Sequence, residues 1–311
     1  MSEITPEITS PAQPAADHRS GFVSLLGRPN AGKSTLLNAF MGEKLSAVTY
    51  KAQTTRHRIF GIYNTDEEQI VFSDTPGVLE SAYELHKLMM TAVRESLEDA
   101  DLLLLLLDAT RPPDDAQAVV TLLNRRRHAP LYVIINKIDA EKTSKPQIKE
   151  LRAWAQENLK PERIYEISAL EGTGVEALMA DVKAAMPVHP PYFDKEQLSD
   201  RTERFFASEI IREKIFLNYR EEVPYACEVV VEAFKEEEAI IRVRAEIFVE
   251  RPTQKGILIG KGGEALKKTA TEAREEMEKF FAKKIFLEVF VKVKPDWRNE
   301  RTMLRRLGYG G

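Results

Sequence analysis

The sequence contains a single cysteine, Cys227, among its 311 residues. One thiol excludes a disulfide within the chain, which favours a reducing compartment such as the cytoplasm. Long apolar runs are also missing. The longest leucine run, 102–107, is too short to cross a bilayer and is flanked by Asp101 and Asp108. Residues 1–19 carry acids, prolines and alanines without the apolar stretch of a secretion signal, so we expect a disordered tail there.

Neither sign of charge is in large excess. The chain has 45 Lys and Arg against 49 Asp and Glu, a net charge of −4. The balance is −7 over residues 1–200, with 22 basic and 29 acidic side chains, and +3 over residues 201–311, with 23 and 20. The positive charge of the second half is clustered. A chain of this length suits two domains, and the change of charge balance agrees with that division.

From residue 21 onward, short apolar segments alternate with segments of helical periodicity. This alternation indicates an α/β fold with a doubly wound, mostly parallel sheet and helices on both faces. Ligands of such sheets bind beyond the carboxyl ends of the strands. We expect strands at 21–27, 56–64, 69–75, 101–109, 131–136 and 163–169, and helices at 33–41, 83–99, 114–127, 145–159 and 174–186.

Three prolines within 187–191 end the alternation, because proline cannot continue a helix. We therefore expect a nucleotide-binding domain at 20–187, a linker at 188–198, a second domain at 199–295 and a basic tail at 296–311. Two adjacent strands beside helices indicate that the second domain is a smaller α+β fold. Its expected elements are helices at 199–220 and 264–282, strands at 226–234, 239–250 and 285–294, and a glycine-rich turn at 260–263.

The segment from Gly27 to Ser34 has the pattern G-x-x-x-x-G-K-S between an expected strand and an expected helix. Glycines there allow backbone N–H groups to face phosphates, and the following helix adds its N-terminal dipole. This defines a P-loop nucleoside triphosphatase, in which Lys33 reaches the β- and γ-phosphates and Ser34 ligates Mg²⁺. The residues assigned to this loop are Gly27, Asn30, Ala31, Gly32, Lys33, Ser34 and Thr35.

Asp74 begins the motif Asp-Thr-Pro-Gly at the end of the strand expected at 69–75. A carboxylate at that position can hold Mg²⁺, and Gly77 can give its N–H to the γ-phosphate. Between the P-loop and this motif, a switch loop needs a threonine that ligates Mg²⁺ only when the γ-phosphate is present. We assign Thr55 to this role, with Thr54 as the alternative.

A third motif, Asn136-Lys137-Ile-Asp139, follows the strand at 131–136. The Asp139 carboxylate can accept hydrogen bonds from guanine N1–H and N2–H₂, a donor pair that adenine lacks. Lys137 can lie over the base, and Asn136 can tie the base loop to the P-loop. We place Ser168, Ala169 and Leu170, at the end of the last strand, beside the base.

The glycine-rich turn of the second domain reads Gly260-Lys261-Gly262-Gly263. It matches the G-x-x-G loop of KH domains, which clamps about four nucleotides of single-stranded RNA. The order helix, two strands, loop, helix, strand fits the type II KH arrangement. Local positive charge supports RNA binding. The residues assigned to it are Lys255, Gly260, Lys261, Gly262, Gly263, Lys267 and, in the C-terminal tail, Arg298.

Together, GRPNAGKS, QTTR, DTPG, NKID and SAL resemble the translation-factor-related GTPases, specifically bacterial members with a C-terminal KH domain, over about residues 20–306. The resemblance implies a monomer that binds GTP, GDP and Mg²⁺ and hydrolyses GTP. It also implies binding to the 3′ end of 16S ribosomal RNA in assembly of the 30S subunit and in rRNA maturation. The inner face of the cell membrane is a further implied partner, contacted peripherally.

One residue bears on the hydrolysis step. In Ras-like enzymes a glutamine after the D-x-x-G motif orients the attacking water, and here Val78 occupies that position. The chain resembles the class in which a hydrophobic residue replaces this glutamine. We assign catalysis to Lys33, Thr55 and Gly77 and expect slow turnover that rises on RNA or ribosome binding. The alternatives are a binding module with negligible hydrolysis and a membrane-surface signalling GTPase.

Overall fold

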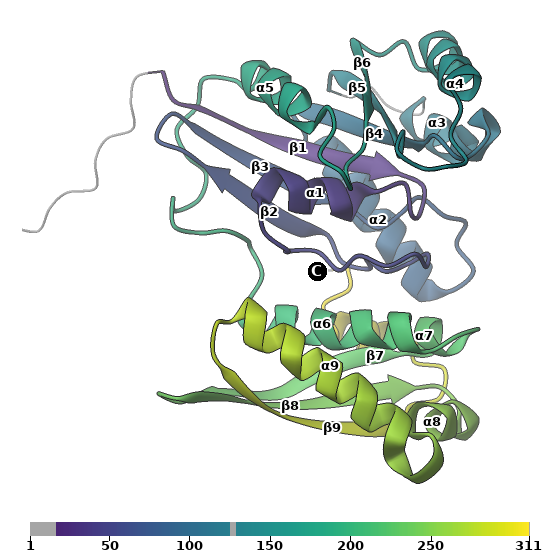
Figure 1. The fold of residues 1–311 in the computed structure, drawn as a ribbon, viewed down its shortest axis with the longest axis vertical. Helices are drawn as coiled ribbons and strands as arrows, with labels where there is room; N and C mark the ends of the chain where they lie inside the picture. Colours follow the sequence, from purple (N-terminus) through teal and green to yellow (C-terminus); the bar gives the residue numbers. More distant parts are fainter. Residues whose placement is uncertain (1–16, 125–128, 311) are drawn as a thin grey trace, which may run out of the picture.

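The computed structural model describes residues 17–124 and 129–310. It has two domains, stacked one above the other in Figure 1. The first contains a six-stranded sheet and the second a three-stranded sheet. This confirms the expected α/β domain followed by a smaller α+β domain. Across the described residues, no helix is both long enough and apolar enough to span a bilayer.

The first sheet is parallel except at one edge, where β2 runs antiparallel to β3. Its spatial order is β2-β3-β1-β4-β5-β6, which places the first strand of the chain near the middle. The strands are β1 (Arg19–Gly27), β2 (Ile59–Asn64), β3 (Glu68–Asp74), β4 (Leu102–Asp108), β5 (Leu131–Asn136) and β6 (Arg163–Ile167).

Alternate leucines of β4 point into two different cores. Leu103, Leu105 and Leu107 pack with one buried cluster, whereas the leucines between them pack with the cluster on the opposite face. A strand buried on both faces has a continuous apolar sequence. The covering helices are α1 (Lys33–Met41), α2 (Glu84–Glu98), α3 (Gln117–Leu123), α4 (Lys145–Asn158) and α5 (Val175–Ala185), with a short 3₁₀ helix η1 (Pro113–Ala116) before α3. The last part of the helix expected at 114–127 lies outside the described residues.

The expected linker at 188–198 is an ordered strap along the edge of the first sheet. Ile62 N donates to Leu198 O at 2.9 Å, so the strap supplies backbone partners to β2. Covering an edge strand in this way prevents unwanted strand pairing. The disordered tail predicted at 1–19 extends too far at its C-terminal end. His18 is buried, with its Nδ1 3.0 Å from His189 O, and β1 begins at Arg19. The rest of that tail, up to residue 16, lies outside the described residues.

The second domain packs two long helices on one face of its sheet. The strand order is β7-β8-β9, with β7 antiparallel and β9 parallel to β8. Cys227 lies in the buried core of this domain. The elements are α6 (Glu203–Asn218), α7 (Val223–Ala226), β7 (Glu228–Glu236), β8 (Ile240–Val249), α8 (Pro252–Ile259), η2 (Lys261–Gly263), α9 (Glu264–Phe280) and β9 (Lys284–Val293).

Helix α8 was not expected from the sequence, although its start carries a signal. Pro252 occupies the first turn, where its fixed φ fits and its missing N–H costs nothing. Gln254 reaches back so that its Oε1 accepts from Arg251 N at 3.0 Å. The helix places the glycine loop between two helix ends, α8 and α9.

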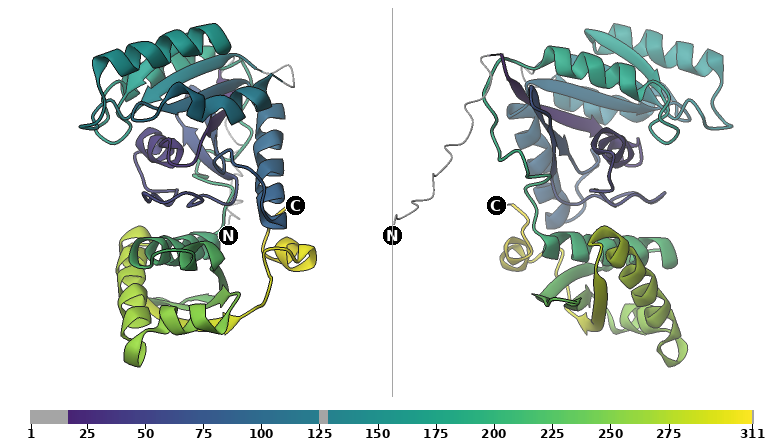
Figure 2. Two further views of the ribbon diagram at one scale, coloured as in Figure 1. Left: turned by 90° about the vertical axis from the view of Figure 1, so that its right-hand side faces the viewer. Right: turned by 60° about the vertical axis from the view of Figure 1, so that its left-hand side comes forward.

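The expected basic tail at 296–311 is also structured, over its described part. Trp297 is fully buried and belongs to the core cluster of the first domain that contains α2. A short helix, α10 (Arg301–Arg306), follows and lies beside α2 in Figure 2. The chain therefore leaves the second domain and returns to the first, which the composition of this segment did not reveal.

We predict that Trp297→Ala destabilises the first domain by about 3–5 kcal/mol, the usual loss when a large buried ring is removed. Thermal unfolding and limited proteolysis of the full chain measure this effect, which should appear as a lower midpoint and new cleavage after β9. Trp154→Ala, which removes a partly buried tryptophan from α4, is the matched control. A midpoint for Trp297→Ala equal to that of the control would contradict the packing described here.

Candidate functional site

The carboxyl ends of β1, β3, β4 and β5 surround a cavity of about 610 Å³. Its walls come from the loop after β1, from residues 47–55, and from the turns that follow β4 and β5. The loops that follow parallel strands leave the sheet at the same edge, which is why segments distant in sequence meet here. The expected nucleotide-binding motifs are thus brought to a single site.

Lys33 lies at the base of this cavity with its ammonium group out of water. Its Nζ donates to Arg28 O at 3.1 Å and lies 3.4 Å from Gly27 O. Burial lowers the pKa of Lys33 to about 8, against the opposing charge of Asp74. Among the described residues, Lys33 Nζ donates hydrogen bonds to carbonyl oxygens alone. A buried cation held in this way gains from an anion such as phosphate.

Three side-chain oxygens meet beside Lys33. Ser34 Oγ donates to Asp74 Oδ2 at 2.6 Å and lies 2.8 Å from Thr55 Oγ1. Thr54 faces elsewhere, with its Oγ1 2.5 Å from Thr49 Oγ1. The geometry therefore separates the two threonines that the sequence left open.

Asp74 is fully buried, and among the described residues its Oδ1 has no hydrogen-bond partner. Burial raises the pKa of Asp74, against the field of Lys33 and the hydrogen bonds from Ser34 and Thr55. A carboxylate oxygen without a partner next to two hydroxyls is a set of hard oxygen donors. Such donors suit Mg²⁺, so the residues present fit that ion.

The loop after Asp74 is packed directly on the P-loop. A Cβ added at Gly77 would lie 2.5 Å from Pro29 N, so only glycine fits there. Val78 N donates to Gly27 O at 3.0 Å, and the Val78 side chain is buried in the core. The position after the D-x-x-G motif therefore turns its side chain away from the cavity.

Asn136 joins three loops of the site. Its Nδ2 donates to Ala31 O at 2.9 Å, and its Oδ1 accepts from Ala169 N at 2.9 Å. A Cβ added at Gly32 would meet the same Nδ2 at 2.1 Å, and Gly32 has φ 101°, which only glycine adopts freely. The expected tie between the base loop and the P-loop is present.

Among the remaining predicted base-binding residues, Lys137 lines the cavity, whereas Asp139, Ser168 and Leu170 do not line it. Lys137 has φ 67° and forms an ion pair with Asp108, with 2.6 Å between Nζ and Oδ2. Burial alone would raise the pKa of Asp108, but hydrogen bonds from Lys137 and Thr110 lower it. Asp139 and Leu170 are exposed, whereas Ser168 is buried.

Two residues of this region received no role from the sequence. Asp108 is the strand partner of Asn136 in neighbouring parallel strands, so its position at the end of a predicted strand was a usable signal. Arg56, directly after Thr55, is buried against the second domain. Nothing in the pattern of the sequence indicates that burial.

In the second domain, the loop 260–263 is open on its outer side. Gly262 has φ 60° and Gly263 φ 84°, and an added Cβ at either would meet no atom within 4 Å. Lys261 and Lys267 are exposed, Lys255 is partly exposed, and no described residue forms an ion pair with any of the three. The loop thus presents bare backbone surrounded by unneutralised cations.

Arg298, expected to bind RNA, is engaged within the protein instead. Its guanidinium pairs with the Glu250 carboxylate through two nitrogens and lies 4.2 Å from the centre of the Tyr83 ring. The hydrogen bonds to Glu250 keep the pKa of Arg298 raised even though burial opposes this. The side chain is 15% exposed, so little of its charge is offered to a partner.

A P-loop, a guanine-type base loop and a G-x-x-G loop on these two folds define a GTPase with a C-terminal KH domain. Residues 22–137 match the family described as 50S ribosome-binding GTPase, and residues 222–298 match the KH domain family. GTPase Era of Syntrophus aciditrophicus is 46% identical over 296 residues, which is 94% of this chain and 95% of that protein. The chain belongs to the Era family of GTPases.

Solved structures of two similar proteins have the same two-domain fold. A variant of Aquifex aeolicus Era bound to GDP and AlF₄⁻ is 37% identical, with a TM-score of 0.85 over 94% of this chain and 99% of that one. An Era in complex with Mg·GDPNP and nucleotides 1506–1542 of 16S ribosomal RNA is 36% identical, with a TM-score of 0.86 over the same shares.

We predict that Asn136→Ala weakens GDP binding by about tenfold or more, because a buried carbonyl and a buried N–H each lose their partner. Isothermal titration with GDP measures the dissociation constant without the complication of hydrolysis. Asn158→Ala is the control, since that side chain donates to Trp154 O on an exposed helix surface. Equal affinities of the two variants would show that the tie does not organise the site.

Proposed function

We propose that this GTPase hydrolyses GTP with Mg²⁺ held by Ser34, Thr55 and Asp74, and that it binds the 3′ end region of 16S ribosomal RNA through its KH domain during assembly of the small ribosomal subunit. The observation that carries the catalytic part is the meeting of Ser34 Oγ with Asp74 Oδ2 at 2.6 Å and with Thr55 Oγ1 at 2.8 Å. The 16S complex of an Era protein supports the RNA part.

The residues of the first domain divide the work of phosphoryl transfer. Lys33 supplies a desolvated positive charge for the β- and γ-phosphates, which is worth more in a dry site than in water. Mg²⁺, when bound, adds further positive charge at the phosphate oxygens. Gly77, pressed against Pro29, offers its backbone N–H to the γ-phosphate, while Ser34, Thr35 and the P-loop backbone hold the nucleotide in position.

Base selection belongs to the loop fixed by Asn136. Asp139 provides the carboxylate for guanine N1–H and N2–H₂, and Lys137 covers the ring. The Ala169 N–H donates to Asn136 Oδ1 and so holds the loop after β6 beside the base. The exposure of Asp139 supports this role, since its carboxylate has no role in the core.

The burial of Val78 supports slow intrinsic turnover. With no polar side chain at that position, the attacking water is oriented by backbone groups, by the switch threonine or by a bound partner. The same observation favours the second candidate function, an RNA-binding switch that uses GTP mainly as a ligand. The proposed location is the cytoplasm, where the ribosome is assembled; contact with the membrane and a monomeric state stay predictions.

We predict that Asp139→Asn moves the preference of the site from GTP toward xanthosine triphosphate by more than about a hundredfold, since an amide cannot accept both guanine donors. Competition between GDP and xanthosine diphosphate, which carry the same two bases, measures this preference without hydrolysis. Asp114→Asn, on the 3₁₀ helix η1, is a suitable control. An unchanged preference for guanine would remove Asp139 from the base-reading role.

For the RNA-binding loop we predict that Gly262→Asp lowers affinity for an RNA spanning 16S nucleotides 1506–1542 by about tenfold or more, because it places an anion against phosphates. Gly262 has open space around it for a side chain, and aspartate is among the non-glycine residues that adopt a positive φ most readily. Gly42→Asp, at another open glycine with positive φ, is the matched control. Fluorescence anisotropy measures the affinity, and a loss no greater than in the control would refute the loop assignment.

The same RNA separates the two candidate functions. Single-turnover GTP hydrolysis that rises on adding the RNA in the wild-type protein, but not in Gly262→Asp, supports a stimulated GTPase. A rate that stays negligible with and without RNA supports the GTP-dependent binding module.

A further inference from the structure

The segment 44–57, here called the switch segment, lies between the two domains. Lys44 Nζ is 2.7 Å from Glu213 Oε2, and Val48 N donates to Glu213 Oε1 at 3.1 Å. Lys51 Nζ donates to two carbonyl oxygens at the end of α6. The segment that closes one side of the nucleotide cavity is thus hydrogen-bonded along its length to the KH domain.

Arg56 makes the deepest of these contacts. Its side chain is 0% exposed. The guanidinium donates to Cys227 O at 2.6 Å, Tyr225 O at 2.8 Å and Glu228 Oε2 at 3.0 Å. These partners all belong to the junction of α7 and β7, so the charge of a first-domain residue is neutralised by the second domain.

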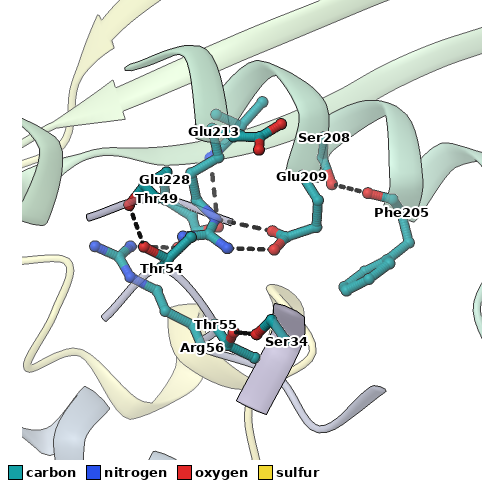
Figure 3. A network of polar contacts seen from close by, with 12 residues as sticks. Ser34, Thr49, Thr54, Thr55, Arg56, Phe205, Ser208, Glu209, Glu213 and Glu228 are labelled. Atoms are coloured by element: carbon teal, nitrogen blue, oxygen red, sulfur yellow. Dashed lines mark hydrogen bonds and ion pairs between the residues drawn. The ribbon is translucent and has the colours of Figure 1, made fainter. Parts of the chain in front are cut away.

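The residue before Arg56 faces the opposite way. Figure 3 shows Thr55 turned toward Ser34, while the Arg56 side chain extends away from both. The two residues share one peptide unit, so the position of the Arg56 backbone limits where the Thr55 hydroxyl can lie. The hydroxyl proposed for Mg²⁺ is therefore tied, through one residue, to the KH domain.

We propose that Arg56 is a positioning residue for GTP hydrolysis, which holds Thr55 beside Ser34 by anchoring the switch segment to the α7–β7 junction. This inference rests on the proposed role of Thr55. The KH domain thereby becomes part of the catalytic architecture, and its placement sets how often Thr55 is available.

Burial makes the anchor close to all-or-none. A guanidinium taken out of water is costly unless it is paired, and removing one partner of a buried pair leaves the other charge uncompensated. Arg56 therefore either keeps its partners at 225–228 or leaves the interface with the rest of the switch segment. Intermediate positions, with the charge buried but unpaired, are unfavourable.

The end of the chain closes over the anchor. Tyr309 OH donates to Glu228 Oε2 at 2.7 Å, the same oxygen that accepts from Arg56. The Tyr309 ring stacks on His57 with 4.1 Å between ring centres and 19° between planes. Tyr309 thus contacts both His57, the residue after Arg56, and Glu228, the carboxylate that Arg56 binds.

A double-mutant cycle tests whether Arg56 acts through Thr55 or only stabilises the fold. Single-turnover GTP hydrolysis is measured at saturating GTP and Mg²⁺ for the full-length wild type, Thr55→Ala, Arg56→Ala and the double variant. We expect Arg56→Ala to lower the rate by about 10- to 100-fold, the scale of a misplaced catalytic group, with GDP affinity unchanged. In the Thr55→Ala background, Arg56→Ala should have no further effect.

Two further variants distinguish loss of the Arg56 anchor from a general loss of stability. Tyr309→Phe retains the ring against His57 and removes only the hydrogen bond to Glu228, so it should lower the rate in the same direction by a smaller factor. Lys44→Ala breaks two ion pairs between the domains, with Glu213 and Glu276, and leaves every contact of Arg56 in place. It should hydrolyse GTP at the wild-type rate.

The outcomes separate this inference from the proposed function. A slow Thr55→Ala with a wild-type Arg56→Ala overturns the anchor alone, and so does an equal loss from Arg56→Ala in both backgrounds. A Thr55→Ala variant that hydrolyses GTP at the wild-type rate overturns the assignment of Thr55, and the anchor with it. A loss in Lys44→Ala as large as in Arg56→Ala also overturns the anchor, because any weakened interface would then suffice.

Discussion

Parallel strand pairing is the constraint on which the nucleotide site depends. β1 pairs with β3 and β4, and β4 with β5, all in the same direction, so their following loops leave the sheet at one edge. The sheet brings the loops together, and a few buried hydrogen bonds then fix them relative to one another. Asn136 holds the P-loop to the loop after β6 in this way. Glycine is required where the loops touch, at Gly32 and Gly77, because no space remains for a side chain.

The boundary between the domains has a different physical character from their cores. Arg56 and Glu228 form an ion pair across the boundary that is almost completely out of water. Such a pair adds little net stability, but it is costly to separate, so it favours one defined contact geometry over many similar ones. Arg212 and Glu209, which are equally buried, pair within α6 on the second-domain side. Burial also lowers the pKa of His57 to about 4 and raises that of Cys227 to about 12. Both groups are therefore neutral at physiological pH, which allows them to pack beside the buried charges.

The sequence predicted what depends on local pattern and on motif spacing. The leucine run of β4, the P-loop and the G-x-x-G loop lie where their patterns place them. It did not predict α8, because a segment of eight residues is too short for its apolar periodicity to distinguish a helix from a loop that leads into the glycine turn. It did not separate Thr54 from Thr55, which are chemically identical neighbours, and only the path of the backbone turns one toward Ser34. The burial of Trp297 and Arg56 could not be predicted from the sequence. Trp297 follows the second domain but packs in the core of the first, and Arg56 belongs to the first domain but is buried by the second.

The return of the chain to the first domain after β9 has a mechanical consequence. The second domain is tethered at both ends, by the strap along β2 on entry and by Trp297 on exit. A rigid body tethered at two points pivots about the line that joins them and cannot drift away. In Figure 1 the junction of α8 and α9, which carries the glycine loop, lies at the end of the domain remote from these tethers. A small rotation at the boundary therefore produces a large displacement of the RNA-binding loop. Conversely, a force that RNA applies at this loop produces a large torque at the boundary between the domains.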